Sequence, residues 1–179
     1  MGKLFGIAVF LAGSAGILAF SRDSLKNPRS HGFPRFFVFE SLLGMAILNI
    51  RGWFNEPGSV HQLVSWFLLC GSIYPAWQGY GMLRSAGKPT DKSFEDTTRL
   101  VTTGLYRYIR HPMYASLMLL GLGIYFKNPM WWPNVALAVL AIASLATTAR
   151  FEEAENLARM GRPYAAYMKR TKMFLPYVF

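Results

Sequence analysis

The sequence predicts an all-α integral membrane protein with about five transmembrane helices and a cytoplasmic C-terminal amphipathic helix. Hydrophobic residues make up 53% of the 179 residues, and the mean hydropathy of +0.22 is high for a soluble domain. The apolar residues also gather in blocks separated by polar segments, and the basic residues are unevenly divided among those segments. These observations favour a chain folded in a bilayer.

Five apolar blocks are candidates for the helical spans. They run from Leu4 to Phe20, Phe36 to Ile50, Val60 to Tyr80, Tyr114 to Phe126 and Trp131 to Ala149. A straight span needs roughly 20 residues, so the two shorter blocks either recruit flanking residues or form re-entrant segments. We prefer five spans, with the first block as a retained helix rather than a cleaved signal peptide.

The basic residues predict how these spans are oriented. The 19 Lys and Arg residues fall before, between and after the blocks in the series 1, 4, 1, 6, 1 and 6. This alternation is expected when basic loops remain in the cytoplasm and an odd number of helices separates the termini. We therefore predict an external N-terminus and a cytoplasmic C-terminus, with the basic loops and any site that they form at the cytoplasmic face.

The net charge of +10 does not require a nucleic-acid partner, because 16 of the 19 basic residues lie on one predicted membrane face. Anionic lipid headgroups explain such a face more simply. Cys70 is a single cysteine, and His31, His61 and His111 are scattered, so we expect neither a disulfide nor a metal. We expect one domain over 1–179, with N-terminal helices at 1–78 and a functional core at 79–179; the sequence leaves the oligomeric state open.

A basic cluster stands where the fourth span begins. In YRYIRHPMYAS, Arg107, Arg110 and His111 come directly before Pro112. Proline suits the first turn of a helix, and a helix N-terminus with added basic groups forms an anion site. The alternative is that these groups anchor the helix at the membrane surface without a ligand, and for Arg107 both interpretations stay open.

An acidic cluster follows the fifth block. Glu152, Glu153 and Glu155 occupy three of four positions where that span leaves the membrane. They can form solvated helical pairs, such as Glu155 with Arg159. A carboxylate at the membrane boundary is costly when unpaired, so Glu152 and Glu153 are the better candidates for a site. The later residues read as an amphipathic helix interrupted near Gly161 to Pro163.

Together these motifs resemble a known family. The stretch LVTTGLYRYIRHPMYASL, the EE pair after the next hairpin and GRPYAAYMKRTKMFLP are similar to the integral membrane methyltransferases, which include isoprenylcysteine carboxyl methyltransferases and phospholipid N-methyltransferases. The resemblance spans Gly79 to Pro176. It implies S-adenosylmethionine as cofactor, bound by His111, Tyr114 and the glutamate pair. Phosphatidylethanolamine methyltransferases also carry a Gly-x-Gly on the helix before this stretch, and here Gly79 and Gly81 occupy the corresponding positions.

The residue chemistry agrees with this cofactor, which carries a sulfonium, an ammonium and a carboxylate. Arg110 and His111 can hold the carboxylate, while Glu152 or Glu153 can face the ammonium. Tyrosine rings can stack on adenine or face the sulfonium. The candidates for this contact are Tyr106, Tyr108 and Tyr114, and Arg150 is a secondary candidate beside the glutamates.

The acceptor is the least defined part of the site. The form of the motif in this sequence, with Glu95-Asp96-Thr97-Thr98 ahead of LVTTG, looks closer to the phospholipid methyltransferases than to the prenylcysteine enzymes. This resemblance implies that the methyl acceptor is a membrane phospholipid such as phosphatidylethanolamine. An amine acceptor must lose a proton, and we expect Glu153, with His111, to be catalytic. Surplus basic groups at Arg84, Lys88 and Arg99 can bind the lipid phosphate. Alternatives are an isoprenylcysteine or small-molecule methyltransferase and a non-catalytic membrane subunit. A reductase with a nicotinamide cofactor is disfavoured, because this sequence lacks a glycine-rich phosphate loop after a predicted strand.

Overall fold

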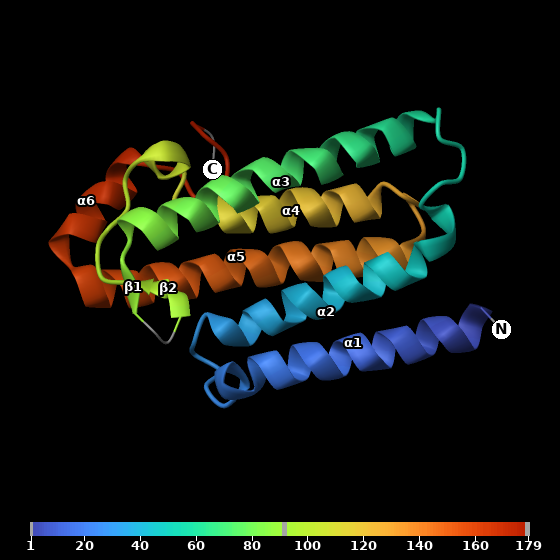
Figure 1. Cartoon of the computed structure of the whole chain (residues 1–179), viewed down its shortest axis with the longest axis horizontal. Coiled ribbons are helices and arrows are strands. Elements are labelled where there is room, and N and C mark those ends of the chain that lie inside the picture. The colour runs from blue at the N-terminus through green and yellow to red at the C-terminus, as the bar shows by residue number, and fades with distance from the viewer. Residues whose placement is uncertain (1, 91–92, 178–179) are drawn as a thin grey trace. The chain divides into compact units, whose positions relative to one another are not determined.

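The computed structural model describes residues 2–90 and 93–177, and over them the chain is mainly helical (Figure 1). The connections contain the 3₁₀ helices η1 (Ile50–Gly52) and η2 (Gly104–Arg107) and the strands β1 (Pro89–Thr90) and β2 (Ser93–Thr97). The α-helices are α1 (Gly2–Leu25), α2 (Gly32–Leu48), α3 (Val60–Ala86), α4 (Pro112–Tyr125), α5 (Trp132–Met160) and α6 (Arg162–Arg170).

The five apolar blocks coincide with α1 to α5, so the helical fold class is confirmed. By length and apolar composition, Leu4–Leu25 and Trp132–Met160 are long enough to cross a membrane, and Pro112–Tyr125 is a shorter apolar helix. The total of five spans stays a prediction. Pro112 is the first residue of α4, as its position in the sequence predicts.

A pair of short strands departs from the all-α expectation. β1 and β2 pair antiparallel, with Pro89 opposite Thr97 and Thr90 opposite Ser93. The all-α prediction includes no strand in this connection. Strands this short lack the alternating apolar pattern by which a strand is recognised in a sequence.

The residues form two compact units, which we describe separately. The first unit comprises 1–69 and 118–151, and the second comprises 70–117 and 152–179. Helices α3, α4 and α5 each contribute residues to both. The division of roles between 1–78 and 79–179 stays a prediction about function.

In the first unit, α1 packs against α2 (Figure 1), and a buried polar network joins the helix connections. Lys127 is only 2% exposed. Its Nζ donates to Gln62 Oε1 at 2.9 Å and to the Trp53 carbonyl at 3.3 Å, and it lies 3.8 Å from the Trp66 ring centre. Lys127 is the single basic residue between the fourth and fifth blocks, and the structure shows it as a buried group within the fold.

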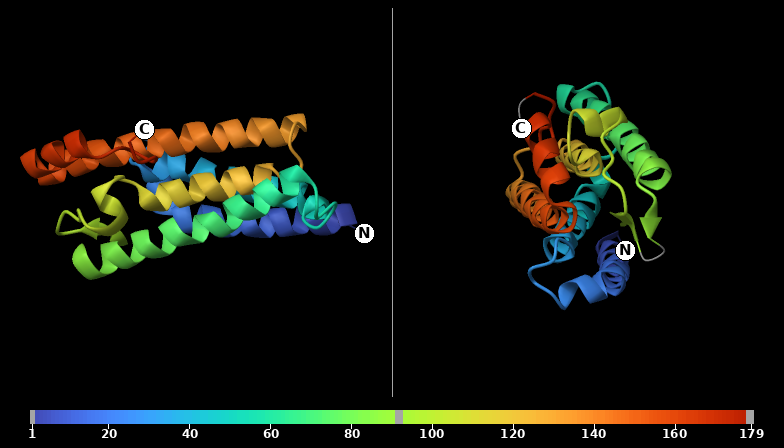
Figure 2. Two further views of the ribbon diagram at one scale, coloured as in Figure 1. Left: turned by 90° about the horizontal axis from the view of Figure 1, so that it is seen from above. Right: turned by 90° about the vertical axis from the view of Figure 1, so that its left-hand side faces the viewer.

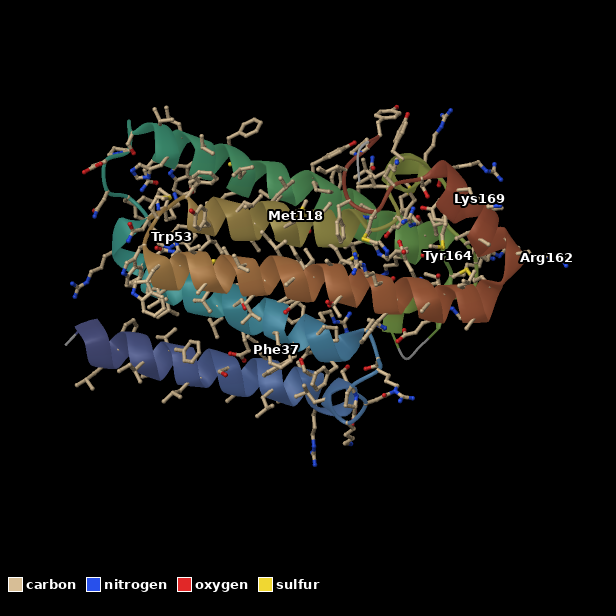
Figure 3. The ribbon with its side chains drawn as sticks, turned by 180° about the vertical axis from the view of Figure 1, so that it is seen from behind. Phe37, Trp53, Met118, Arg162, Tyr164 and Lys169 are labelled. Atoms are coloured by element: carbon tan, nitrogen blue, oxygen red, sulfur yellow. The ribbon has the colours of Figure 1, made fainter. Side chains whose placement is uncertain are left out.

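In the second unit the chain reverses between α5 and α6 (Figure 2). Gly161 has φ +61°, a left-handed conformation that favours glycine. The predicted break near Gly161 to Pro163 is therefore confirmed. Helix α6 is amphipathic, since it buries Tyr164 and Tyr167, while Arg162 and Lys169 are exposed and point outward in Figure 3.

The two glycines of the Gly-x-Gly motif allow a matched test of packing on α3. A Cβ at Gly79 would lie 2.9 Å from Met113 Cγ, whereas a Cβ at Gly81 meets nothing within 4 Å. We expect Gly81→Ala to raise the free energy of unfolding by up to about 1 kcal/mol through helix propensity. Gly79→Ala should instead lower it by about 1 kcal/mol, because the contact opposes that gain. Unfolding in detergent measures both, and equal effects would contradict the close approach.

Candidate functional site

The basic and acidic clusters of the sequence meet in the second unit. Glu153 Oε1 accepts a hydrogen bond from Arg110 Nε at 2.5 Å and lies 3.2 Å from His111 Nε2. On the other side of the imidazole, Glu152 Oε2 is 3.8 Å from His111 Nδ1. Each ring nitrogen of His111 therefore faces a carboxylate oxygen, but only Glu153 is within hydrogen-bond distance, and the tautomer with a proton on Nε2 can donate to it.

The two glutamates differ in solvent contact. The side chains of Arg110 and Glu153 are each 10% exposed, and that of His111 is 4% exposed. The Glu152 side chain is 24% exposed. Glu153 is thus the buried and paired carboxylate, whereas Glu152 is the more accessible one.

The guanidinium of Arg110 is largely engaged within the protein. Besides Glu153, it donates through Nη1 to the Thr171 carbonyl at 2.5 Å and to the Met168 carbonyl at 3.3 Å. These carbonyls lie at the C-terminal end of α6, where a cation is favoured by the helix dipole. These contacts hold the guanidinium in place, and the binding of the cofactor carboxylate by Arg110 stays a prediction.

The segment after α6 is bound to the basic loop through its backbone. Ile109 and Lys172 form a parallel bridge; Arg110 N donates to Lys172 O at 2.8 Å, and His111 N donates to Met173 O at 3.1 Å. Phe174, 4% exposed, lies with its ring centre 6.1 Å from that of His111. The C-terminal segment thus fixes the position of His111.

A cavity of about 60 Å³ adjoins this cluster. Its lining includes five of the residues predicted from sequence, namely Tyr106, Arg110, His111, Tyr114 and Glu152. Sequence reasoning missed other lining residues, of which the polar members are Thr97, Asn156, Arg159, Tyr164 and Tyr167. Asn156 and Arg159 follow Glu152 at helical spacings of four and seven, a signal that could have found them.

Aromatic side chains form much of the cavity wall. The His111 and Tyr114 rings are stacked, with centres 5.3 Å apart and planes 12° apart. Tyr167 donates its hydroxyl to the Tyr106 carbonyl at 2.7 Å, which holds η2 in place. Burial raises the pKa of Tyr164, and Glu153 and Glu152 raise it further; burial, followed by Tyr164, raises the pKa of Tyr167. Both phenols are therefore protonated donors at neutral pH.

The other predicted site residues lie outside the cavity lining. Gly79 packs against α4, and the space around Gly81 is open. Arg150 is exposed and belongs to the first unit. Arg84, Lys88 and Arg99 are exposed; Arg84 donates to the Tyr80 hydroxyl at 3.1 Å. The Arg99 backbone N–H donates to Gly87 O at 3.1 Å, which brings Lys88 and Arg99 close in the same loop region.

Comparison with known proteins identifies the family. A family model described as phospholipid methyltransferase matches residues 60–160. The chain belongs to this family. It is also 29% identical over 144 residues to a methanethiol S-methyltransferase of Pseudomonas deceptionensis, covering 79% of this chain and 50% of that protein. The chain thus spans about half the length of this curated relative.

The phospholipid methyltransferase match includes the loop before α4, α4 itself and α5, and therefore both charged clusters. The resemblance derived from the RHPMY and EE motifs is confirmed. The family is one of phospholipid methyltransferases, and the apolar helices of the chain agree with a membrane location.

The different environments of the two glutamates predict different effects on stability. Glu153→Leu should lower the free energy of unfolding by about 3 kcal/mol, because it leaves Arg110 buried without its carboxylate. Glu152→Leu should change stability by less than about 1 kcal/mol, since this side chain is more exposed and its charge contact is longer. Thermal unfolding of the two variants in detergent, without added ligand, measures the difference. Equal losses would show that Glu153 is not the buried partner of Arg110.

Proposed function

We propose that the protein transfers a methyl group from S-adenosylmethionine to the amine of a membrane phospholipid, with phosphatidylethanolamine as the first acceptor to test. The observation that supports this best is the grouping of Glu152, His111 and Glu153 beside an aromatic cavity. A cofactor with ammonium, carboxylate and sulfonium groups needs both charge signs and aromatic faces within one site.

Glu152 is the better candidate for the cofactor ammonium. Its carboxylate lines the cavity, is partly exposed and has a charge contact of 3.8 Å to His111. Arg159 also lines the cavity and is exposed, so it can take the carboxylate role that we first gave to Arg110. Tyr106 and Tyr114 offer ring faces for adenine or the sulfonium.

The cavity is small for such a cofactor. Its volume of about 60 Å³ lies below the roughly 300–1,000 Å³ of typical ligand sites. The polar groups thus match the cofactor in chemistry, and binding requires the wall to widen. Met160 and Arg159 have long flexible side chains on the cavity wall and are the residues best able to move.

The hydrogen bonds support a proton path for an amine acceptor. With its Nε2–H donating to Glu153, His111 keeps an unprotonated Nδ1 that can take the proton from the substrate ammonium. Glu153 then acts by fixing this tautomer, and Glu152 stays available for the cofactor. When bound, S-adenosylmethionine supplies the electrophilic methyl carbon, and the protein contributes mainly by aligning the free amine with it.

Exposed basic residues near the end of α3 support a phosphate-bearing acceptor. Lys88 and Arg99 lie close together, as described above, and Arg84 is in the last turn of α3. Thr97, which lines the cavity, is in the segment adjacent to Arg99. A lipid phosphate bound by these cations would place the amine on the cavity side.

A second candidate is methyl transfer to a small thiol, and the methanethiol S-methyltransferase relative favours it. A thiol ionises far more readily than an ammonium group loses its proton, so a thiol acceptor depends less on a protein base. The two candidates therefore differ in their need for His111.

Acceptor assays distinguish them. Full-length protein in nanodiscs, given labelled S-adenosylmethionine, should methylate phosphatidylethanolamine and its monomethyl form, as detected by lipid mass spectrometry. His111→Ala should reduce amine methylation by at least about 100-fold by removing the base, whereas Lys169→Ala, on the exposed face of α6, is the matched control. Methylation of methanethiol alone, or of a farnesylcysteine analogue alone, would reject the phospholipid acceptor.

We also propose that the C-terminus and the site are cytoplasmic, in accord with the charge series. Alkaline phosphatase fused after Phe179 should be inactive, because this reporter folds only outside the cytoplasm, and a fusion near Gly58 should be active. The positive-inside distribution is the physical reason. Activity of the C-terminal fusion would reverse the orientation, and an inactive Gly58 fusion would overturn the five-span count.

A further inference from the structure

The first unit contains a second, larger cavity. A groove of about 770 Å³ is lined by α1, α2, η1 and the beginning of α5, and its volume is typical of sites for small ligands. Ile7, Phe10 and Leu137 are among its apolar walls. Gly44 lies on it as well, and a Cβ there would come within 3.2 Å of Leu137 Cδ1. The glycine therefore allows Leu137 to pack closely against α2 at the groove wall.

Two polar side chains on α2 interrupt the apolar lining. Glu40 accepts a hydrogen bond from the Ser14 hydroxyl at 2.9 Å through Oε1, which leaves Oε2 to accept another. The adjacent Ser41 is 1% exposed, and its hydroxyl has no hydrogen-bond partner among the described residues. Buried hydroxyls are normally paired, so this group points to a ligand.

We infer that the groove binds an apolar alcohol whose hydroxyl group donates to Glu40 and accepts from Ser41. A hydroxyl group matches both side chains, because it is donor and acceptor at once. An ammonium only donates, and a hydrocarbon does neither. The apolar walls require an apolar body, and a groove bordered by the membrane helix α1 receives such a molecule from the lipid phase. The ligand class is therefore a long-chain or polycyclic lipid alcohol.

Photolabelling tests this site with a defined ligand. The probe is 1-hexadecanol carrying a diazirine in its chain, added to the full chain in nanodiscs, with labelled peptides identified by mass spectrometry. Labelling should concentrate on the peptides of α1 and α2 that line the groove. Unlabelled 1-hexadecanol should compete at about a hundredfold lower concentration than hexadecane, as expected when the bonds to Glu40 and Ser41 each contribute about tenfold.

Variants separate hydroxyl recognition from simple hydrophobic uptake. Ser41→Ala should reduce the competition by 1-hexadecanol about tenfold without lowering thermal stability, because the hydroxyl it removes is unpaired in the protein. Thr147→Ala is the matched control, since the Thr147 hydroxyl already donates to Ala143 O at 2.9 Å in its own helix. Equal competition by alcohol and hydrocarbon, an unchanged Ser41→Ala variant, or labelling spread evenly over all helices would each overturn the inference.

Discussion

The contact between Glu153 and Arg110 is the constraint on which the site depends. It joins three segments that are distant in sequence: α5 supplies Glu153, the loop before α4 supplies Arg110, and the end of α6 supplies carbonyl acceptors for the same guanidinium. Removing two charges from water is costly, and good geometry with additional hydrogen bonds is needed to offset that cost. Here the bonds to the Met168 and Thr171 carbonyls and the contact with His111 provide them.

This pairing decides which charges remain for ligands. Arg110 and Glu153 neutralise each other in a largely dry environment, so neither offers free charge to the cavity. Glu152 keeps a negative charge with partial access to solvent, and Arg159 is the exposed cation on the same wall. Two adjacent glutamates of identical chemistry thus lie in different environments, because successive positions on a helix face about 100° apart.

Much of this arrangement was predictable because it follows from local patterns. Apolar blocks predicted α1 to α5, Pro112 predicted the start of α4, and Gly161 to Pro163 predicted the break before α6. The motifs predicted that His111 and the glutamates belong to one site. The role of Arg110 was not predictable in this way, since the carbonyls it binds lie at an α6 end whose position depends on tertiary contacts. The bridge between Ile109 and Lys172 was not predictable either, because backbone hydrogen bonds do not require particular residue types.

The buried state of Lys127 bears on the orientation of the chain. The positive-inside pattern depends on cations that interact with headgroups or remain in water during insertion. In the folded protein Lys127 is held by Gln62, Trp53 and Trp66, so it is not available to lipid headgroups. Arg51, by contrast, is exposed on the proposed external face, and the predicted cytoplasmic face carries most of the basic residues of the chain. Counting residues along the sequence therefore includes one predicted external cation that the fold buries, and the cytoplasmic location of the site stays a prediction from the charge series.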